Sequence, residues 1–371
     1  MKKIMFVFGT RPEAIKMWPI IRQAQEASGI QPIVCVTSQQ LNLQDQALSC
    51  LELTADYNLS VMIPDQTLDH IVSTVLAKLG PVLDKEHPDL VIVQGDTTTA
   101  FSAAMAAFHR LIPVAHVEAG LRTHNRLSPF PEEMNRVLLS RIADWHFAAT
   151  PQNKQNLIKE GVSEHRIIVV GNPVVDAVNL VLTNPALSGE FQKWADDALL
   201  FDLNEPYIVA TLHRRENFGE PLKRIWKAIT TWMTENPTWH CVVPMHPNPR
   251  VRDELEKDRD HFPNLHLVDP IDYFKFLFLL KSAKFAVSDS GGIQEEAPTL
   301  EVPVVLVREN TERPEALESG WVKMVGTETM PVLTQMSAFQ TNPKPAHTTG
   351  SPFGNGDAGR QIIQFIQKTE L

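Results

Sequence analysis

The chain contains little cysteine. Its 371 residues include three, Cys35, Cys50 and Cys241. This number is odd, and the three positions show none of the paired spacings typical of a disulfide framework or a zinc site. We therefore expect a protein of a reducing compartment, the cytoplasm, that holds no metal ion.

Long apolar runs are also missing. Residues 4–8 follow two lysines in the manner of a signal peptide, but the run ends at Gly9, short of the about 7–15 apolar residues of a signal sequence. No stretch approaches the ~18 consecutive apolar residues of a membrane span. The sequence predicts a soluble, cytoplasmic protein without a membrane partner.

Positive charge is scarce, since 34 Lys and Arg residues stand against 44 Asp and Glu residues and give a net charge of −10. Binding to nucleic acid or anionic membranes depends on clustered Lys and Arg. We expect no nucleic-acid partner, and local groups must bind any anionic ligand.

Short, continuous apolar runs recur along the chain, whose length and 43% hydrophobic content suit two globular domains. Such runs are typical of strands buried on both faces of a parallel sheet. Helical patterns lie between them, as across residues 100–108 and in the stripe Ile71, Val75, Leu79 and Val82. The first domain is thus predicted to be a doubly wound α/β sheet, with strands at residues 4–8, 33–36, 90–93, 114–117, 146–149 and 167–170.

The segment 171–173 and the polar stretch 184–205 interrupt this rhythm. A second series of apolar runs follows and predicts another parallel sheet. Its strands are expected at residues 207–211, 240–244, 265–268, 285–287 and 302–307.

The chain is polar and rich in proline between Val325 and Asp357. A last helix then carries one apolar face, made of Ala358, Ile362, Phe365 and Ile366. We predict an N-terminal Rossmann-like domain at 1–172, a C-terminal nucleotide-binding domain at 173–352, and a segment 353–371 whose helix returns to the N-terminal domain.

Three blocks, at residues 9–13, 95–99 and 288–296, lie where a predicted strand gives way to a helix. Helix N-termini carry exposed N–H groups and partial positive charge, and they bind phosphate. Because two blocks fall in the first domain and one in the second, we expect two α/β domains that face one diphosphate ligand.

The third block supplies candidate groups for a nucleotide. Ser290, Gly291 and Gly292 place backbone amides at a helix N-terminus, and Glu296 lies about one turn further on, where it can bind ribose hydroxyls. An ordinary glycine turn with a capping serine explains the same pattern, and both interpretations stay open.

Three cations also follow predicted strand ends. Arg11 and Lys16 lie after the first strand and Arg313 lies beyond the strand at 302–307. A guanidinium fork and an ammonium point charge suit phosphate oxygens. Surface charge is the alternative, and it fits Arg11 least because this residue lies between a turn glycine and a proline.

Acids form a second theme. Asp96, Glu118 and Glu132 follow strands whose carboxyl ends face the ligand crevice of an open α/β sheet. Each alone can be a helix cap or a salt-bridge partner, but three together suit proton transfer. His213 and His246 lack metal-ligand spacing, so we expect donors to a departing phosphate.

The segment 354–359 matches the Gly-x-Gly-x-x-Gly fingerprint of dinucleotide sites. It follows a polar loop instead of a strand, and too few residues remain for a βαβ unit. We interpret it as a turn that enters the last helix, and we expect no cofactor.

Together these blocks closely resemble the non-hydrolysing UDP-N-acetylglucosamine 2-epimerases over almost the whole chain. The resemblance implies a GT-B-type pair of Rossmann-like domains with the active site in the cleft between them, and a homodimer. It also implies reversible conversion of UDP-GlcNAc to UDP-ManNAc, which supplies ManNAc units for surface polysaccharide. The matching segments are residues 8–17, 95–99, 117–123, 128–133, 213–217, 288–298, 311–316 and 352–354.

The resemblance further implies a mechanism, in which UDP is eliminated to leave a 2-acetamidoglucal and is then added back at C1, with a proton added to the opposite face of C2. Asp96, Glu118 and Glu132 become the candidate acids and bases. His213 and Arg11 would stabilise the departing diphosphate. The remaining substrate-binding residues would be Ser290, Gly291 and Gly292 for phosphate, Glu296 for ribose, Phe276 for uracil, and Lys16 and Arg313 for sugar or diphosphate.

Some positions depart from the family pattern. Residues 39–42 and Asp65 differ where certain relatives form a second, activating UDP-GlcNAc site, so the resemblance does not extend to allosteric activation. Leu212, Ile271 and Trp321 also differ, but they leave the acids untouched.

Three alternatives remain open at this point. A GT-B glycosyltransferase needs an acceptor and no acid–base set at C2, and a hydrolysing epimerase releases free ManNAc and UDP. A nucleotide-sugar sensor would bind without turnover. The patterns Pro12-Glu13 and 118–120 favour the non-hydrolysing epimerase over the hydrolysing one, and the intact acids count against a sensor.

Overall fold

The computed structural model describes residues 1–38, 51, 53–342 and 350–371. Cys50 and residues 39–42, which depart from the activating site of certain relatives, lie outside this part of the chain. The chain divides into two compact units, of which unit 1 comprises Met1–Ala177 with Phe353–Leu371 and unit 2 comprises Val178–Pro352. The division falls after Ala177, whereas the sequence interpretation placed the boundary at residue 172.

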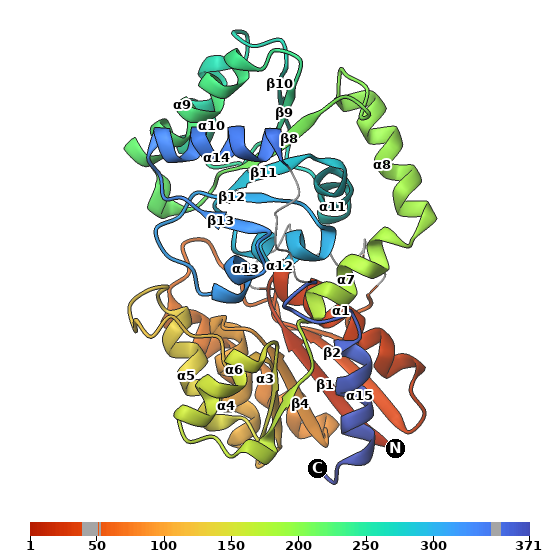
Figure 1. The fold of residues 1–371 in the computed structure, drawn as a ribbon. Coiled ribbons are helices and arrows are strands. Elements are labelled where there is room, and N and C mark those ends of the chain that lie inside the picture. The colour runs from red at the N-terminus through yellow and green to blue at the C-terminus, as the bar shows by residue number, and fades with distance from the viewer. Residues whose placement is uncertain (39–50, 52, 343–349) are drawn as a thin grey trace. The chain divides into compact units, whose positions relative to one another are not determined.

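Unit 1 is built on a parallel sheet of seven strands in the order β3-β2-β1-β4-β5-β6-β7 (Figure 1). The strands are the continuous apolar runs of the sequence, and helices shield both faces from water. The two-residue β3 was not predicted, because so short a strand has no periodicity to detect. Their bounds are β1 (Lys2–Phe8), β2 (Ile30–Val36), β3 (Tyr57–Asn58), β4 (Leu90–Gln94), β5 (Val114–Ala119), β6 (Trp145–Ala148) and β7 (Ile167–Val169).

Helices pack on both faces of this sheet. α3, α4 and α5 contact one another in a row, and α1 and α15 pack together. Because crossovers between parallel strands are right-handed, these two groups lie on opposite faces. The helices of unit 1 are α1 (Arg11–Glu26), α3 (Leu68–Glu86), α4 (Thr98–Phe108), α5 (Glu132–Ile142), α6 (Pro151–Lys159), α7 (Pro173–Leu182), which continues into unit 2, and α15 (Ala358–Lys368).

The last helix belongs to unit 1. The ring of Phe365 in α15 makes edge contacts with Trp145 and Phe147 of β6. Gly359 approaches α1 so closely that a Cβ atom there would lie 3.0 Å from the Pro19 carbonyl oxygen. Any larger residue at 359 would therefore push α15 away from α1.

Unit 2 contains a parallel sheet of six strands in the order β10-β9-β8-β11-β12-β13. The large side chains Trp232, Phe285 and Phe339 meet in its main core, between α9, β11 and α14. Its strands are β8 (Tyr207–Thr211), β9 (His240–Pro244), β10 (Leu265–Val268), β11 (Phe285–Ser288), β12 (Val304–Leu306) and β13 (Val322–Met324). Its helices are α8 (Pro185–Ala198), α9 (Glu220–Glu235), α10 (Pro249–Leu255), α11 (Tyr273–Ser282), α12 (Gly291–Leu300), α13 (Pro314–Glu318) and α14 (Thr329–Thr341).

Two of these helices correct the sequence interpretation, which assigned no structure to residues 184–205 or to the polar stretch after Val325. α8 buries Phe191 and Ala195, four residues apart, and α14 buries Val332, Met336 and Phe339. Both helices have polar residues between their apolar ones, so neither segment shows a continuous apolar run. Among the described residues, no helix combines the length and the apolar character needed to cross a membrane.

Two histidines are buried side by side in the first sheet. His116 of β5 and His146 of β6 are register partners and are 0% and 1% exposed. Burial lowers the pKa of His116 to about 4 and that of His146 to about 3. The Nε2 atom of His116 lies 2.7 Å from the Gly95 carbonyl oxygen, so this nitrogen carries the proton and donates it.

We expect acid to weaken β5 and β6. Below the ordinary histidine pKa of 6.5 the unfolded imidazoles bind protons and the folded ones do not, so stability falls as the pH drops from 6.5 to about 4. The carboxyl groups of Glu13 and Asp176, whose pKa burial raises to about 6, oppose this trend because their folded forms bind protons first. Amide hydrogen exchange of β5 and β6, corrected for the intrinsic rate, measures the net loss.

The matched variant is His116→Gln, whose amide can still donate to the Gly95 carbonyl oxygen but does not titrate. We expect β5 in this variant to lose less protection between pH 6.5 and 4 than in the original chain. An equal loss in both proteins would contradict the assignment of His116 as a buried neutral base.

Candidate active site

The candidate residues of each unit gather where the strand order reverses. In unit 1 the reversal lies between β1 and β4, and in unit 2 between β8 and β11. Open α/β sheets bind ligands outside the carboxyl ends of the strands at such a point, because the loops there diverge to opposite faces. The loops after these four strands carry Arg11, Asp96, His213 and Ser290.

Glu118 lies at the end of β5 and is held by two donors. The Lys16 ammonium of α1 lies 2.8 and 2.7 Å from its two carboxylate oxygens, and Gln94 of β4 also donates to it. Glu118 has a left-handed backbone with φ of 63°, where the register of β5 against β6 shifts. Such a conformation is costly for a non-glycine residue, which indicates that the contacts at this strand end hold it.

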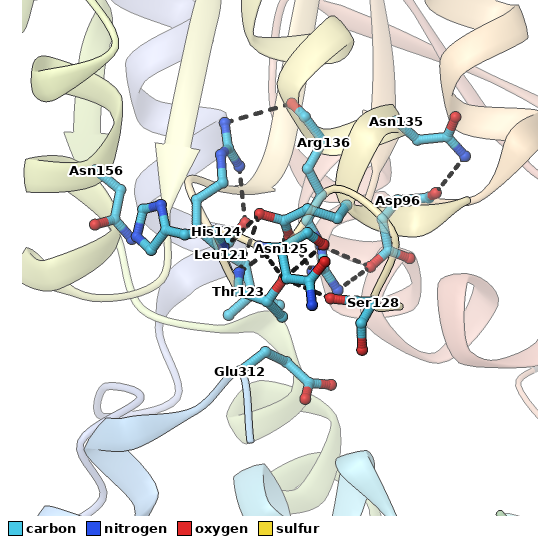
Figure 2. Close-up of polar contacts among 12 residues, drawn as sticks. Asp96, Leu121, Thr123, His124, Asn125, Ser128, Asn135, Arg136, Asn156 and Glu312 are labelled. Carbon is cyan, nitrogen blue, oxygen red and sulfur yellow. Dashed lines mark hydrogen bonds and ion pairs between the residues drawn. The ribbon is translucent and has the colours of Figure 1, made fainter. Parts of the chain in front are cut away.

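Asp96 follows β4 and is bound by two consecutive residues of α5 (Figure 2). Arg136 places Nε 2.9 Å and Nη2 2.5 Å from Oδ2, and Asn135 Nδ2 donates to the Asp96 carbonyl oxygen at 2.9 Å. The Asp96 side chain is 26% exposed, so an ionised carboxylate at this position still meets solvent.

Glu132 is the first residue of α5 and is half-buried. The next residue, Glu133, is buried and accepts the backbone N–H groups of Thr123 and His124 at 2.9–3.1 Å. Glu133 therefore anchors the loop between β5 and α5, and the sequence analysis did not identify this role. The N–H donors follow β5 and lie nine and ten residues upstream of Glu133, too far for a local motif to reveal.

Glu13 is a second buried carboxylate that the sequence analysis passed over. Its Oε2 accepts the N–H groups of Gly9 and Thr10 at 3.0 and 2.7 Å, and its Oε1 accepts the Thr97 hydroxyl at 2.6 Å. Burial raises its pKa to about 6. The spacing Thr10-x-x-Glu13 is a capping box and could have identified it. Glu13 therefore joins the turn before Arg11, at Gly9 and Thr10, to Thr97 in the loop after β4.

In unit 2, Asp289 organises the loop that carries His213. It is 0% exposed and accepts the backbone N–H groups of His213 and Arg214 and the side-chain amide of Asn217, all at 3.0–3.1 Å. The Nδ1 atom of His213 lies 3.2 Å from Asp289 Oδ1. Burial lowers the pKa of His213, and the Asp289 charge works in the opposite direction.

The N-terminus of α12 is positively charged. Ser290 is the N-cap, and a Cβ atom on Gly291 would lie 3.0 Å from Arg214 Nη2 and 3.2 Å from Arg313 Nη1. Two guanidinium groups thus reach the first turn of this helix, whose N–H groups carry partial positive charge. Arg214 was not among the predicted residues, because nothing in its local pattern distinguishes it from Arg215.

Buried acids hold Arg313 and the nearby Arg308. Arg313 lies 2.5 Å from Glu295 Oε1 and 2.5 Å from Glu312 Oε1, and Arg308 lies 3.2 Å from Glu312 Oε2. Burial alone would raise the pKa of Glu312, but Arg313 and Arg308 hold it well below its ordinary value. The charge of Arg313, predicted to be available to a ligand, is therefore already compensated within unit 2.

The other predicted positions are placed as follows. Phe276 is a half-buried ring on α11 that packs against the core cluster containing Tyr207 and Leu279. Gly292 follows Gly291, and Glu296 is buried on the same helix. Among the described residues, no three His, Cys, Asp or Glu side chains form a group able to hold a metal ion.

The chain is similar to known proteins over almost its whole length. A family model described as UDP-N-acetylglucosamine 2-epimerase matches residues 22–367. Proteins named UDP-N-acetylglucosamine 2-epimerase are 42% identical over 370 residues in Neisseria meningitidis, with 99% of each chain covered, and 40% identical over 377 residues in Yersinia pestis, with 100% and 99% covered. The crystal structure of the Neisseria meningitidis protein bound to UDP-GlcNAc has a TM-score of 0.92 at 41% identity, and the match covers 99% of this chain and 100% of that one. The predicted fold class of two Rossmann-like domains of GT-B type is confirmed.

The Asp289–His213 contact makes a prediction that does not depend on function. Removing the buried negative charge in Asp289→Asn should lower the pKa of His213 further, because an adjacent carboxylate favours the imidazolium. Titration of the His213 ring protons by NMR measures this shift. Asp272→Asn, which keeps an N-cap at α11, is the control and should leave the midpoint in place. A midpoint in Asp289→Asn that is unchanged or raised would refute the contact.

Proposed function

This chain belongs to the UDP-N-acetylglucosamine 2-epimerase family, and we propose that it interconverts UDP-GlcNAc and UDP-ManNAc without hydrolysis. The similar protein of Neisseria meningitidis was crystallised with UDP-GlcNAc, which supports a nucleotide-sugar substrate for this chain. We further propose a cytoplasmic homodimer that needs no cofactor and whose product supplies ManNAc units for surface polysaccharide.

The chemistry must overcome an unreactive C–H bond. The proton on C2 of the sugar has no adjacent carbonyl group to acidify it, so direct removal and return of this proton would be very slow. Elimination of UDP to a 2-acetamidoglucal, followed by addition of UDP with a proton delivered to the other face of C2, avoids a free carbanion. This route requires an acid and a base on the sugar and donors on the diphosphate.

The observation that carries the proposal is the set of three carboxylates near the ends of two neighbouring strands of unit 1. Glu118 is the last residue but one of β5, Asp96 follows the adjacent β4, and Glu132 begins α5, whose residues 135 and 136 bind Asp96. The proposed reaction needs one group as the acid and another as the base, and three carboxylates can supply both. In this proposal Asp96, Glu118 and Glu132 exchange protons with the sugar, while Lys16 holds Glu118 in place and contacts the sugar.

We assign the nucleotide to unit 2. The N-terminus of α12, with Ser290, Gly291 and Gly292, would bind the diphosphate, and Arg214 and Arg313 reach the same turn. Glu296 would accept the ribose hydroxyls and Phe276 would contact uracil.

The leaving group needs its own donors. When the C–O bond breaks, negative charge develops on the diphosphate, and His213 and Arg11 are the groups we assign to stabilise it. Asp289 supports this role of His213, because its position beside Nδ1 leaves Nε2 as the ring nitrogen for the ligand. Water must be excluded meanwhile, since it would trap the glucal.

The direct test is proton NMR of UDP-GlcNAc with the protein in deuterium oxide and no acceptor. We expect a second set of UDP-sugar resonances, those of UDP-ManNAc, and deuterium at C2 of both sugars. Free ManNAc with UDP would instead indicate a hydrolysing epimerase, and no change without an acceptor would indicate a glycosyltransferase or a binding protein.

Isosteric variants test the carboxylates. Asp96→Asn and Glu118→Gln should keep UDP affinity within about threefold while the rate of epimerisation falls by roughly 10²–10⁴, the usual contribution of a general acid or base. Glu164→Gln, an exposed acid paired with Lys154, is the control and should keep full activity. Undiminished turnover in either variant would remove that residue from the proton-transfer steps.

A further inference from the structure

We propose that Arg136 is a positioning residue for the reaction, which fixes the Asp96 carboxylate relative to α5 and its first residue Glu132. This inference rests on the proposed function, because it assigns Arg136 to the acid–base set of that reaction. Neither the family motifs quoted above nor the predicted site residues include Arg136.

The contacts of Arg136 are those of a rigid link. Its side chain is 4% exposed and makes two hydrogen bonds to Asp96 Oδ2, from Nε at 2.9 Å and from Nη2 at 2.5 Å (Figure 2). The third nitrogen, Nη1, donates to Glu133 Oε2 at 3.0 Å. One planar guanidinium group therefore joins two carboxylates, and its geometry fixes the direction between them.

The same group joins two loops. Asp96 belongs to the loop after β4, while Glu133 accepts the N–H groups of Thr123 and His124 in the loop after β5. Thr123 in turn donates its hydroxyl to the Ser128 carbonyl oxygen at 2.6 Å (Figure 2). Arg136 thus connects the loop of Asp96, through Glu133, with Thr123 and His124 in the loop that leads into Glu132.

The choice of oxygen matters for chemistry. The two bonds from Nε and Nη2 of Arg136 both go to Oδ2. Asn135 holds the main chain of the same residue through its carbonyl oxygen. Because α5 holds both the backbone of Asp96 and its Oδ2 atom, the position of the other carboxylate oxygen, Oδ1, is fixed as well. A misplacement of this atom by about 1 Å can cost on the order of 10²-fold in rate.

A buried arginine can also serve the fold alone, and Arg122 provides the comparison. Its side chain is 1% exposed, and it bonds Glu160 through Nε at 2.7 Å and Nη2 at 2.8 Å. It lies in the same unit and makes the same kind of ion pair, and its other contacts are to Ser140 Oγ at 2.6 Å and to the carbonyl oxygens of Leu121 and Arg136. Loss of Arg122 therefore measures the cost of removing a buried arginine that does not bind the Asp96 carboxylate.

The experiment compares Arg136→Ala with Arg122→Ala in the full chain, using UDP-GlcNAc as the probe. For Arg136→Ala we expect kcat to fall about 10²-fold, with UDP affinity within about threefold. Millimolar methylguanidine should restore at least a tenth of the lost rate, because it can fill the vacated site and bind both carboxylates. Arg122→Ala should lose stability, measured by thermal unfolding, without a loss of kcat that methylguanidine restores.

Each outcome decides the proposal. Unchanged kcat in a folded Arg136→Ala protein overturns it, and so does equal rescue of both variants or a rate that merely follows the folded fraction. If Arg136→Ala does not fold, Arg136→Lys decides instead. Its point charge cannot span both carboxylates, so kcat should fall about tenfold at constant UDP affinity, and an unchanged kcat overturns the proposal.

The original chain is assayed in parallel to separate this inference from the proposed function. If it fails to epimerise UDP-GlcNAc, the proposed function is wrong and the role of Arg136 is wrong with it. If it epimerises the substrate and both Arg136 variants match it, the proposed function stands and only the role of Arg136 is overturned.

Discussion

The candidate site depends on one constraint, the need of loops at parallel strand ends to satisfy their backbone N–H groups away from water. Glu13, Glu133 and Asp289 meet this need in the same way, since each is buried and accepts two backbone N–H groups from one loop. A buried carboxylate is costly unless its oxygens are bonded, and a loop with unpaired N–H groups is equally costly. Each pairing removes both penalties, so the loops that carry Arg11, Thr123 and His213 are fixed before any ligand arrives.

The strands of both sheets were predictable because they are buried on both faces and therefore read as continuous apolar runs. The helices α8 and α14 were not, because each buries two or three apolar side chains that are separated by polar residues. Such a helix shows little periodic contrast along the chain. β3 and β13 were missed because neither is an apolar run: β3 has two residues, Tyr57 and Asn58, and β13 buries only Val322 of its three.

The residues of the candidate site also differ in how far they could be predicted from the sequence. Asp96, Glu118, Ser290 and Gly291 lie at strand ends, and the position of a strand end is a local property of the sequence. Residues that hold them in place are defined by partners distant in the chain, as Arg136 is 40 residues from Asp96 and Asp289 is 76 from His213. No local spacing encodes such a pair. Glu13 is the exception, because its capping box is local, and it was open to prediction from the sequence.

In unit 2 acidic side chains hold cations in place, and in unit 1 cations hold acidic side chains in place. In unit 2 the acids Glu295 and Glu312 bind Arg313, and Glu312 also binds Arg308, which fixes guanidinium groups near a helix terminus that already attracts anions. In unit 1 the cations Lys16 and Arg136 serve the acids, each holding a carboxylate that the proposed reaction requires to gain or lose a proton. The arginine offers Asp96 a planar fork that makes two hydrogen bonds to one oxygen, whereas the lysine offers Glu118 a point charge 2.8 and 2.7 Å from its two oxygens. The two neighbouring carboxylates are therefore held in different ways, Asp96 through one oxygen and Glu118 through both.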